Sequence, residues 1–224
     1  MKRLLILRLE GLLQSWDDSS KWDDRDTGSF PSKSGVIGLL GCALGLERGS
    51  HELVDLDCAI TMAVRADRSG VKTVDFQTVT GNPLRNAEGK KRSPGGDTII
   101  SRRSYLQDAC FTVFLEMEGF WHERIVKALN APKWCLFLGR KSCVPSRPVL
   151  ECCEPGYSDI TEAMRLYPLA ARSSYPVPFE TEIQDDLLSS VTRADVISDV
   201  DRQFGRRRVW RGLIEEGDCV SFES

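Results

Sequence analysis

The chain has 224 residues, of which 41% are hydrophobic and 28% are charged, and its formal net charge is -3. This composition is typical of globular proteins and argues against a chain that stays disordered. The longest apolar run, residues 36–46, is shorter than the roughly 20 residues needed to cross a bilayer, and residues 1–11 lack a signal-peptide cleavage pattern. We therefore expect a cytoplasmic protein with no membrane partner.

The cysteines and histidines indicate neither a disulfide framework nor a metal site. The eight cysteines include no C-x-x-C pair and mostly lie within apolar segments, so we expect buried free thiols. His51 and His122 are the only imidazoles, which makes a zinc site improbable by the usual ligand types. We predict no metal and no cofactor.

Positive charge is concentrated in a few segments, although the chain as a whole is acidic. Each basic segment stands beside a predicted strand or a glycine turn; they are residues 85–96, 101–105, 139–142 and 202–211. A single charged run is usually a solvated surface, but four runs next to such elements favour a surface for an anionic partner.

The N-terminal part predicts a strand followed by a helix. Residues 3–11 form a short apolar run bounded by charge, typical of a central strand buried on both faces. The next apolar segment, up to residue 46, predicts a buried helix capped by Ser32 or Ser34. Glycines interrupt it at three- and four-residue spacing, each costing about 0.5–1 kcal/mol relative to alanine in a helix interior. We interpret them as positions where the helix backbone approaches a neighbouring sheet closely: Gly35, Gly38, Gly41 and Gly45.

The middle of the chain predicts strands and a projecting arm. Residues 58–67 and 71–81, separated by an R-S-G turn, are interpreted as a β-hairpin because they alternate in part and are rich in β-branched residues. Residues 82–98 are basic and rich in glycine and proline, and loops of this length are usually functional or disordered. Further strands are expected at residues 98–106 and 108–118.

The fold class that follows is α+β. Residues 119–132 predict a helix ended by Pro132, and residues 134–139 a short buried strand. Up to about residue 150 the order is therefore strand, helix, strand, strand, helix, strand, which matches the ferredoxin-like arrangement of RNA-recognition folds.

The last third predicts a smaller, β-rich C-terminal subdomain over residues 151–224. It contains a short helix within residues 157–168, with Asp159 and Glu162 as a capping box, and strands at residues 189–200 and 208–216. We therefore divide the chain into residues 1–150, including the arm, and residues 151–224.

Five segments of this chain, in the same order, resemble sequence blocks of one family. They are "TGSFPSKSGVIGLLGCALGLER" (27–48), "DFQTVTG" (75–81), "RRSYLQDACFTVFL" (102–115), "LGRKSCVPSRPVL" (138–150) and "DRQFGRRRVW" (201–210). The chain resembles the Cas5 family of RAMP proteins, in the form found in the type I-E CRISPR surveillance complex, Cascade.

The resemblance implies a non-catalytic crRNA-binding subunit that holds the 5′ handle of the CRISPR RNA and caps the backbone filament for antiviral defence. It implies a ferredoxin-like domain with a protruding thumb, which would correspond to residues 82–104. The implied partners are the crRNA, the backbone subunit CasC and the large subunit CasA, with target DNA reached only through the assembled complex. The basic residues of the thumb would be Arg85, Lys90, Lys91 and Arg92.

A single-stranded handle needs cations for its phosphates, accessible backbone amides and faces for splayed bases. Lys33 and Ser34 stand at the start of the glycine-rich helix, where a phosphate can bind the helix N-terminus. A strand-ending turn offers amides, two cations and a hydroxyl, and the base of the arm offers charge and a stacking ring. These candidates are Gly139, Arg140, Lys141 and Ser142, and Arg102, Arg103 and Tyr105. Arg206 and Arg207 are further candidates, for which a partner-protein contact or plain solvation is an equal alternative.

Two other functions remain open from the sequence. One Cas5 subtype cuts precursor crRNA itself, so a metal-independent endoribonuclease is the alternative, with His51 or His122 as proton acceptor. Both histidines are more typical of solvated or structural positions, and the thumb region contains no Lys-His dipeptide like that of the catalytic subtype. The other alternative is a protein adaptor whose basic patches bind acidic partners. We expect a non-enzyme.

Overall fold

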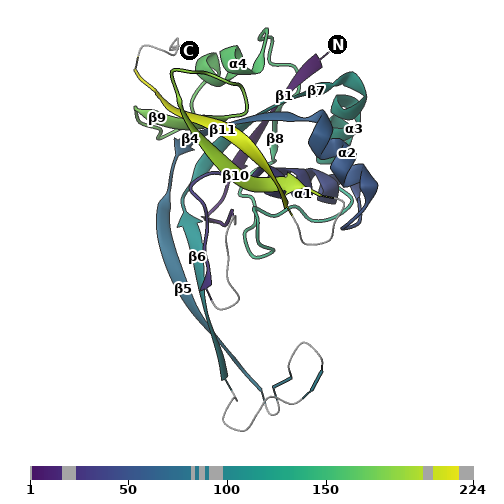
Figure 1. Cartoon of the computed structure of the whole chain (residues 1–224), viewed down its shortest axis with the longest axis vertical. Coiled ribbons are helices and arrows are strands. Elements are labelled where there is room, and N and C mark those ends of the chain that lie inside the picture. Colours follow the sequence, from purple (N-terminus) through teal and green to yellow (C-terminus); the bar gives the residue numbers. More distant parts are fainter. Residues whose placement is uncertain are drawn as a thin grey trace.

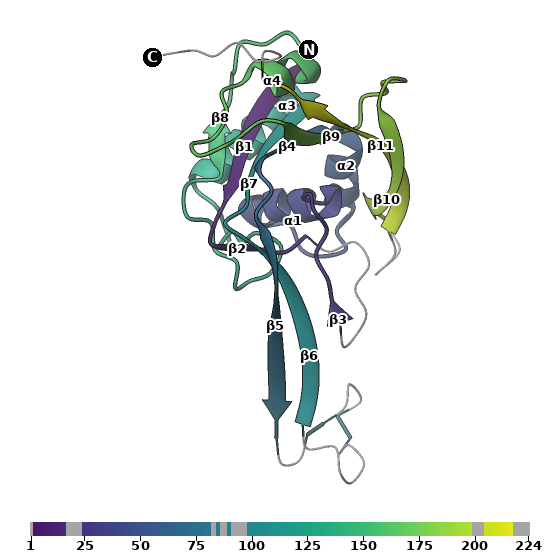
Figure 2. The ribbon, with the colours of Figure 1, turned by 90° about the vertical axis from the view of Figure 1, so that its left-hand side faces the viewer.

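The computed structural model describes residues 2–16, 24–81, 84–85, 89–90, 98–198 and 204–216. A seven-stranded antiparallel sheet forms the body, and a long two-stranded ribbon projects from it (Figures 1 and 2). In sheet order the body strands are β10 (Ser189–Ile197), β11 (Phe204–Ile214), β9 (Val177–Thr181), β4 (Thr61–Arg68), β7 (Cys110–Glu118), β1 (Lys2–Glu10) and β8 (Leu150–Cys152). The second sheet contains β2 (Leu13–Gln14), β3 (Asp24–Arg25), β5 (Val71–Thr80) and β6 (Thr98–Gln107).

Strand β1 lies inside the body sheet, between β7 and β8, as its apolar run predicts. Its side chains alternate between two hydrophobic clusters. Leu5 and Leu7 pack into the larger cluster with α1 (Lys33–Leu44), α2 (His51–Ala59) and α3 (Gly119–Asn130). Leu4 and Ile6 pack on the other face with α4 (Ile160–Leu166). The sheet is therefore covered by helices on both faces.

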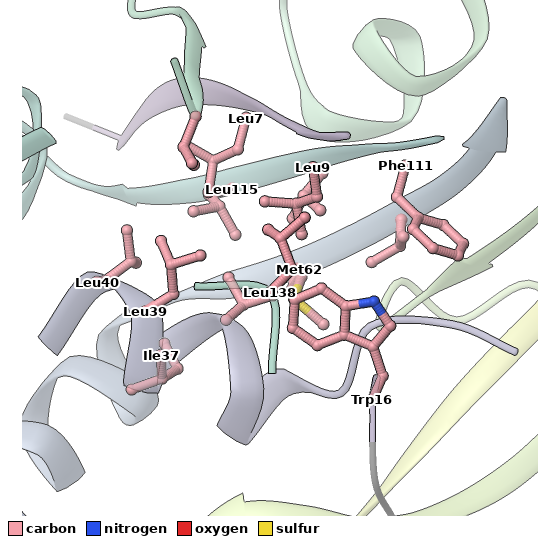
Figure 3. Packing of buried hydrophobic residues seen from close by; sticks show 14 of the residues in the cluster. Leu7, Leu9, Trp16, Ile37, Leu39, Leu40, Met62, Phe111, Leu115 and Leu138 are labelled. Atoms are coloured by element: carbon pink, nitrogen blue, oxygen red, sulfur yellow. The ribbon is translucent and has the colours of Figure 1, made fainter. Parts of the chain in front are cut away.

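The larger cluster is closed by two side chains from outside the regular elements. Trp16, from the chain after β2, and Leu138, from the chain after α3, meet Met62 and Phe111 of the sheet (Figure 3). Both are almost fully buried, which anchors the loops that carry them to the core. These two loops form the base of the projecting ribbon.

The glycine-rich helix is α1 (Lys33–Leu44), capped by Ser32, whose side chain accepts a hydrogen bond from the amide of Gly35. It is buried as predicted, but the expected role of its glycines is wrong. A Cβ at Gly35 would meet the Trp16 ring at 3.1 Å and one at Gly41 would meet Leu53 of α2 at 2.6 Å, whereas one at Gly38 meets nothing within 4 Å. The glycines thus admit a loop tryptophan and a second helix rather than a sheet.

The expected hairpin between residues 58–67 and 71–81 is also wrong. Residues 51–59 form α2, which the sequence analysis missed, and β4 pairs with β7 and β9 rather than with β5. Strand β5 instead pairs along its whole length with β6, from Val71 opposite Gln107 to Thr80 opposite Thr98. This β5–β6 ribbon extends away from the body (Figure 2) and is longer than the arm expected at residues 82–104.

Other expectations along the chain have mixed outcomes. The strands β6, β7, β10 and β11 and the helices α3 and α4 are confirmed within a few residues. The strand expected at residues 134–139 is wrong, because this segment is an irregular loop and Trp134 is 41% exposed. The C-terminal strands join the body sheet through the pairing of β9 with β4. The sheet therefore runs through both parts of the chain.

The cysteine prediction holds only in part. Cys110 and Cys143 are buried free thiols, but Cys58 and Cys135 are exposed. Cys219 lies outside the described residues. Among the described residues, none of the helices is both long and apolar enough to cross a membrane.

Candidate nucleic-acid interface

The root of the β5–β6 ribbon brings together two groups of predicted site residues, from β6 and from the turn after α3. The guanidinium carbon of Arg140 lies 4.7 Å from the centre of the Tyr105 ring. Arg140 also donates from Nη1 to the carbonyl oxygen of Ser104 at 3.0 Å. Its Nη2 donates to the carbonyl oxygen of Arg25, in β3, at 2.8 Å. Tyr105 is 5% exposed, so its ring is covered by the protein itself.

The turn that carries Arg140 is closed by backbone hydrogen bonds. Leu138 donates to the carbonyl oxygen of Cys143 at 2.7 Å, and Cys143 donates to that of Arg140 at 2.8 Å. Gly139 has φ +86°, and a Cβ there would lie 1.7 Å from the carbonyl oxygen of Ser15. The turn therefore requires glycine at this position. Lys141 and Ser142, at its tip, are exposed.

Two more arginines lie on the ribbon itself. Arg102 is exposed and stands opposite Phe76 of β5, which is 58% exposed. Arg103 is half-buried, and its Nε is buried without a hydrogen-bond partner in the described part of the chain. An exposed cation thus stands beside an exposed aromatic ring about midway along the ribbon, a combination that suits single-stranded nucleic acid.

Lys33 is placed differently from what the sequence predicts. Its backbone amide donates to Asp195 at 2.7 Å, and its ammonium lies 3.1 Å from Glu182 Oε1. A carboxylate therefore occupies the N-terminus of α1, where the sequence analysis expects a phosphate. Lys33 is 7% exposed, and Ser34 beside it is half-buried.

Arg207 and Arg206 point to opposite faces of β11. Arg207 donates to Asp195 and to Glu182, and with Glu180, Arg193, Arg211 and Lys33 it forms an ion-pair network beneath β10 and β11. Burial alone lowers the pKa of Arg207, but the hydrogen bond and charge of Asp195 and the neighbouring glutamates outweigh it and raise that pKa. Arg206 is exposed and has no ion pair among the described residues.

The expected thumb residues lie at the far end of the ribbon. Arg85 is exposed and donates to the carbonyl oxygen of Gly89 at 2.7 Å, and Lys90 is exposed. Lys91 and Arg92 lie outside the described residues.

The two histidines of the catalytic alternative lie on α2 and α3. His51 is exposed at the start of α2. His122 is buried, with Nε2 2.6 Å from the carbonyl oxygen of Cys153 and Nδ1 without a hydrogen-bond partner among the described residues. No described contact joins either imidazole to the ribbon root. Their surroundings are those of a solvated and a structural histidine.

Acidic and neutral residues that the sequence does not indicate as site residues complete the root. Asp26 forms an ion pair with Lys72 of β5, with Oδ1 and Nζ 2.6 Å apart. Burial raises the pKa of Asp26 less than the hydrogen bond from Lys72 lowers it, so this pKa lies below its usual value. Ser15 donates from Oγ to the carbonyl oxygen of Ser104 at 3.3 Å. In the sequence, Asp26 stands at the end of an acidic run, residues 16–26, which does not by itself indicate Lys72 as its partner.

Comparisons with known proteins cover nearly the whole chain. Residues 4–210 match the family described as CRISPR-associated protein (Cas_Cas5). The CRISPR system Cascade subunit CasD of Escherichia coli is 32% identical over 238 residues, covering 99% of this chain and 100% of that protein. A chain of a solved CRISPR RNA-guided surveillance complex is similar with a TM-score of 0.77 at 32% identity, covering 95% of this chain and 90% of that one. A crystal structure of a Cas protein gives a TM-score of 0.75 at 32% identity, with 96% and 97% covered. The chain therefore belongs to the Cas5 family of CRISPR-associated proteins.

Proposed function

We propose that this chain is the Cas5 subunit of a type I-E Cascade complex, where it holds the 5′ handle of the crRNA and caps the backbone filament. The observation that carries the proposal is the likeness to CasD, which spans 99% of this chain at 32% identity. The cationic ribbon root supports it, because it offers what a single strand requires: positive charge, an exposed apolar side chain on the ribbon and an exposed turn that carries Lys141 and Ser142.

We propose a ferredoxin-like core for this subunit. The strand order β8–β1–β7–β4, with antiparallel neighbours, and the helices α1 after β1 and α3 after β7 support this assignment. We assign the β5–β6 ribbon as the family's thumb. The division into residues 1–150 and 151–224 stays a proposal. Because one sheet contains strands from both parts, the division would concern how the chain folds rather than two separate sheets.

Within the handle site, exposure and pairing separate two roles. Exposed side chains are assigned to direct RNA contact: Arg102, Lys141, Ser142 and Arg206, with Arg85 and Lys90 on the thumb. Lys91 and Arg92, which lie outside the described residues, are assigned to the thumb from the sequence. Residues that are buried, half-buried or held by contacts within the protein are assigned to supporting positions: Lys33, Ser34, Arg103, Tyr105, Arg140 and Arg207. Gly139 is assigned to the same group because it lets the turn approach Ser15 closely.

The proposed subunit binds RNA without cutting it, and a separate subunit processes the precursor. The exposed position of His51 and the buried position of His122 beside a carbonyl oxygen support this, because neither offers a base next to the cationic surface. The proposed partners are the crRNA, the backbone subunit CasC and the large subunit CasA. Target DNA is read by pairing with the guide.

The test is binding of the purified full chain to end-labelled crRNA with an intact or a scrambled 5′ handle, followed by native and denaturing gels. Handle-dependent retardation without cleavage is expected. Specific cleavage of repeat RNA would instead support the endoribonuclease. Equal retardation of intact and scrambled handles would support the adaptor, whose basic surface does not read the handle.

Matched charge variants locate the contact. Lys141→Ala, at the exposed turn, is compared with Lys127→Ala, which removes the same charge from the exposed face of α3. For single strands, log K falls with log salt concentration by about 0.7 per neutralised phosphate. Lys141→Ala should therefore lower the slope by about 0.7 and Lys127→Ala should leave it unchanged. Equal effects of both variants would place the RNA elsewhere.

A further inference from the structure

The β5–β6 ribbon leaves the body through two short connections. Strand β4 ends at Arg68 and β5 begins at Val71, while β6 ends at Gln107 and β7 begins at Cys110. Both connections contain a residue with positive φ, Gly70 at 72° and Asp108 at 56°. At its root the ribbon is also held by β2, which pairs with Leu106 and Gln107, and by Tyr105 and Leu106, which are buried in the main hydrophobic cluster. Beyond these residues the ribbon can bend relative to the body, because few contacts there oppose the motion.

Arg140 supplies a further attachment away from these connections. Its guanidinium stacks on Tyr105 and donates to the carbonyl oxygen of Ser104, both on β6. The same group donates to the carbonyl oxygen of Arg25 in β3, which pairs with β6 in parallel. One side chain therefore ties the ribbon to the loop that runs beside it.

The turn that presents Arg140 is itself held by the body. Leu138 and Cys143 flank it and are buried, and Leu138 lies in the main hydrophobic cluster (Figure 3). Ser15 donates its amide to the carbonyl oxygen of Leu138 at 3.1 Å, and Gly139 fits against Ser15 without room for a Cβ. The guanidinium therefore extends from a rigid base to the ribbon.

The contacts of Arg140 leave it poorly suited to bind a phosphate. A two-point phosphate contact needs two side-by-side N–H donors, and both such pairs of a guanidinium, Nε with Nη2 and Nη1 with Nη2, include Nη2. Here Nη2 donates to the carbonyl oxygens of Arg25 and, at 3.5 Å, of Asp26. One face of the guanidinium plane also lies over the Tyr105 ring. Lys141 and Ser142, the next two residues, are exposed instead.

We propose that Arg140 is a positioning residue that sets the angle of the β5–β6 ribbon relative to the body. This inference rests on the proposed function. If the exposed turn and the cationic ribbon bind the same RNA strand, the distance between them must stay fixed, and Arg140 would fix it. Lysine cannot replace Arg140, since an ammonium has neither the planar face nor the fork that joins two carbonyls.

The first test needs no RNA. Spin labels on non-natural residues at Thr78, exposed on β5, and Asp55, exposed on α2, report the distribution of distances between ribbon and body. Native cysteines are avoided because Cys58 and Cys135 are exposed. Arg140→Ala and Arg140→Lys should both broaden the distribution, whereas Lys141→Ala should not. An unchanged distribution in Arg140→Ala would overturn the proposal, and thermal unfolding checks that each variant is folded.

The second test separates positioning from phosphate contact. Arg140→Ala should weaken binding of handle RNA roughly tenfold, while the salt slope stays that of the unsubstituted chain. A slope lowered by about 0.7, with an unchanged distance distribution, would mean that Arg140 contacts a phosphate directly. If the unsubstituted chain fails to bind handle RNA, the proposed function fails, while the distance measurement still decides the role of Arg140.

Discussion

Arg207 and Asp195 form a two-point ion pair beneath the β10–β11 hairpin, with Nε 2.8 Å from Oδ1 and Nη2 2.9 Å from Oδ2. Asp195 also accepts the amide of Lys33 at the start of α1. Burial raises the pKa of Asp195, but its bonds to Arg207, the Lys33 amide and the charge of Arg193 outweigh burial and lower it. This pair therefore joins the C-terminal hairpin to the glycine-rich helix.

Arg207→Met should lower the free energy of unfolding by about 3 kcal/mol, because it leaves a buried carboxylate without its main partner. The control is Arg206→Met, the same change at the neighbouring exposed position, which should cost less than about 0.5 kcal/mol. Chemical denaturation of both variants measures the difference. Equal losses would mean that Arg207 is solvated.

Asp67→Ala should be among the most damaging single changes in the body. Asp67 is buried and accepts hydrogen bonds from the guanidinium groups of Arg8 and Arg65 and from the amide of Ala170. Its removal leaves the buried guanidinium of Arg65 without a carboxylate and that of Arg8 with Glu151 alone, and it should cost about 3–5 kcal/mol. Asp75→Ala, on the exposed ribbon, should change the unfolding free energy by less than about 0.5 kcal/mol. A denaturation midpoint for Asp67→Ala near that of the control would refute this account.

Alanine substitutions at Gly139 and Gly49 distinguish the cost of backbone strain from the cost of a steric clash, because the two glycines have similar φ angles but different surroundings. Gly139 and Gly49 have φ of +86° and +81°, but a Cβ at Gly139 would lie 1.7 Å from the carbonyl oxygen of Ser15, whereas one at Gly49 meets nothing within 4 Å. Gly49→Ala should cost about 1–2 kcal/mol, the ordinary penalty of a left-handed residue. Gly139→Ala should cost at least about 2 kcal/mol more, because the turn must move. Similar thermal midpoints for both variants would contradict the role of Ser15.

Asp57 should make stability fall as pH rises through the acid range. It is 1% exposed, its Oδ1 has no hydrogen-bond partner among the described residues, and burial raises its pKa to about 6. The folded state therefore holds this proton between about pH 4 and pH 6, where the unfolded state, with a pKa near 3.9, releases it. Protonation of Asp57 therefore stabilises the folded state relative to the unfolded state at low pH, and this stabilisation is lost as pH rises through 6.

Asp57→Asn removes this titration while keeping the shape of the side chain. The variant should be more stable than the unsubstituted chain at pH 7, by about 1–3 kcal/mol, and the advantage should shrink by pH 5. Urea denaturation at both pH values measures it, and the difference between the two proteins cancels the other titrating groups. An advantage that is the same at both pH values would show that Asp57 does not change its charge there.

The comparison of β4 and β5 shows where sequence patterns stop being informative. Both segments predict strands correctly, because β-branched content and alternation are local properties. Their partners are not local: β4 is buried and needs a strand on each side, whereas β5 is exposed on both faces and leaves the body. Polar residues do not separate the two strands in the sequence, because β4 also carries charged residues, which the fold buries in ion pairs.

The candidate site divides in the same way. Cationic segments and their neighbouring turns could be found from the sequence, and so could the family resemblance, because both depend on residue types at short spacing. The partners of those cations could not be found. Lys33 and Arg207 are engaged by carboxylates from a part of the chain distant from Lys33, namely Glu180, Glu182 and Asp195. From the sequence alone, nothing distinguishes these two engaged cations from the exposed Arg206.

The sequence by itself therefore determined most of the helices and strands, the buried central strand and the family, since hydrophobic period, capping and motif order act over a few residues. Only the tertiary structure decided which strands pair, which glycines admit Trp16 and Leu53, and which arginines reach solvent. The physical reason is that burial and ion pairing depend on groups far apart in the chain, so a guanidinium such as that of Arg140 acquires its role from the carbonyls and ring that the fold places around it.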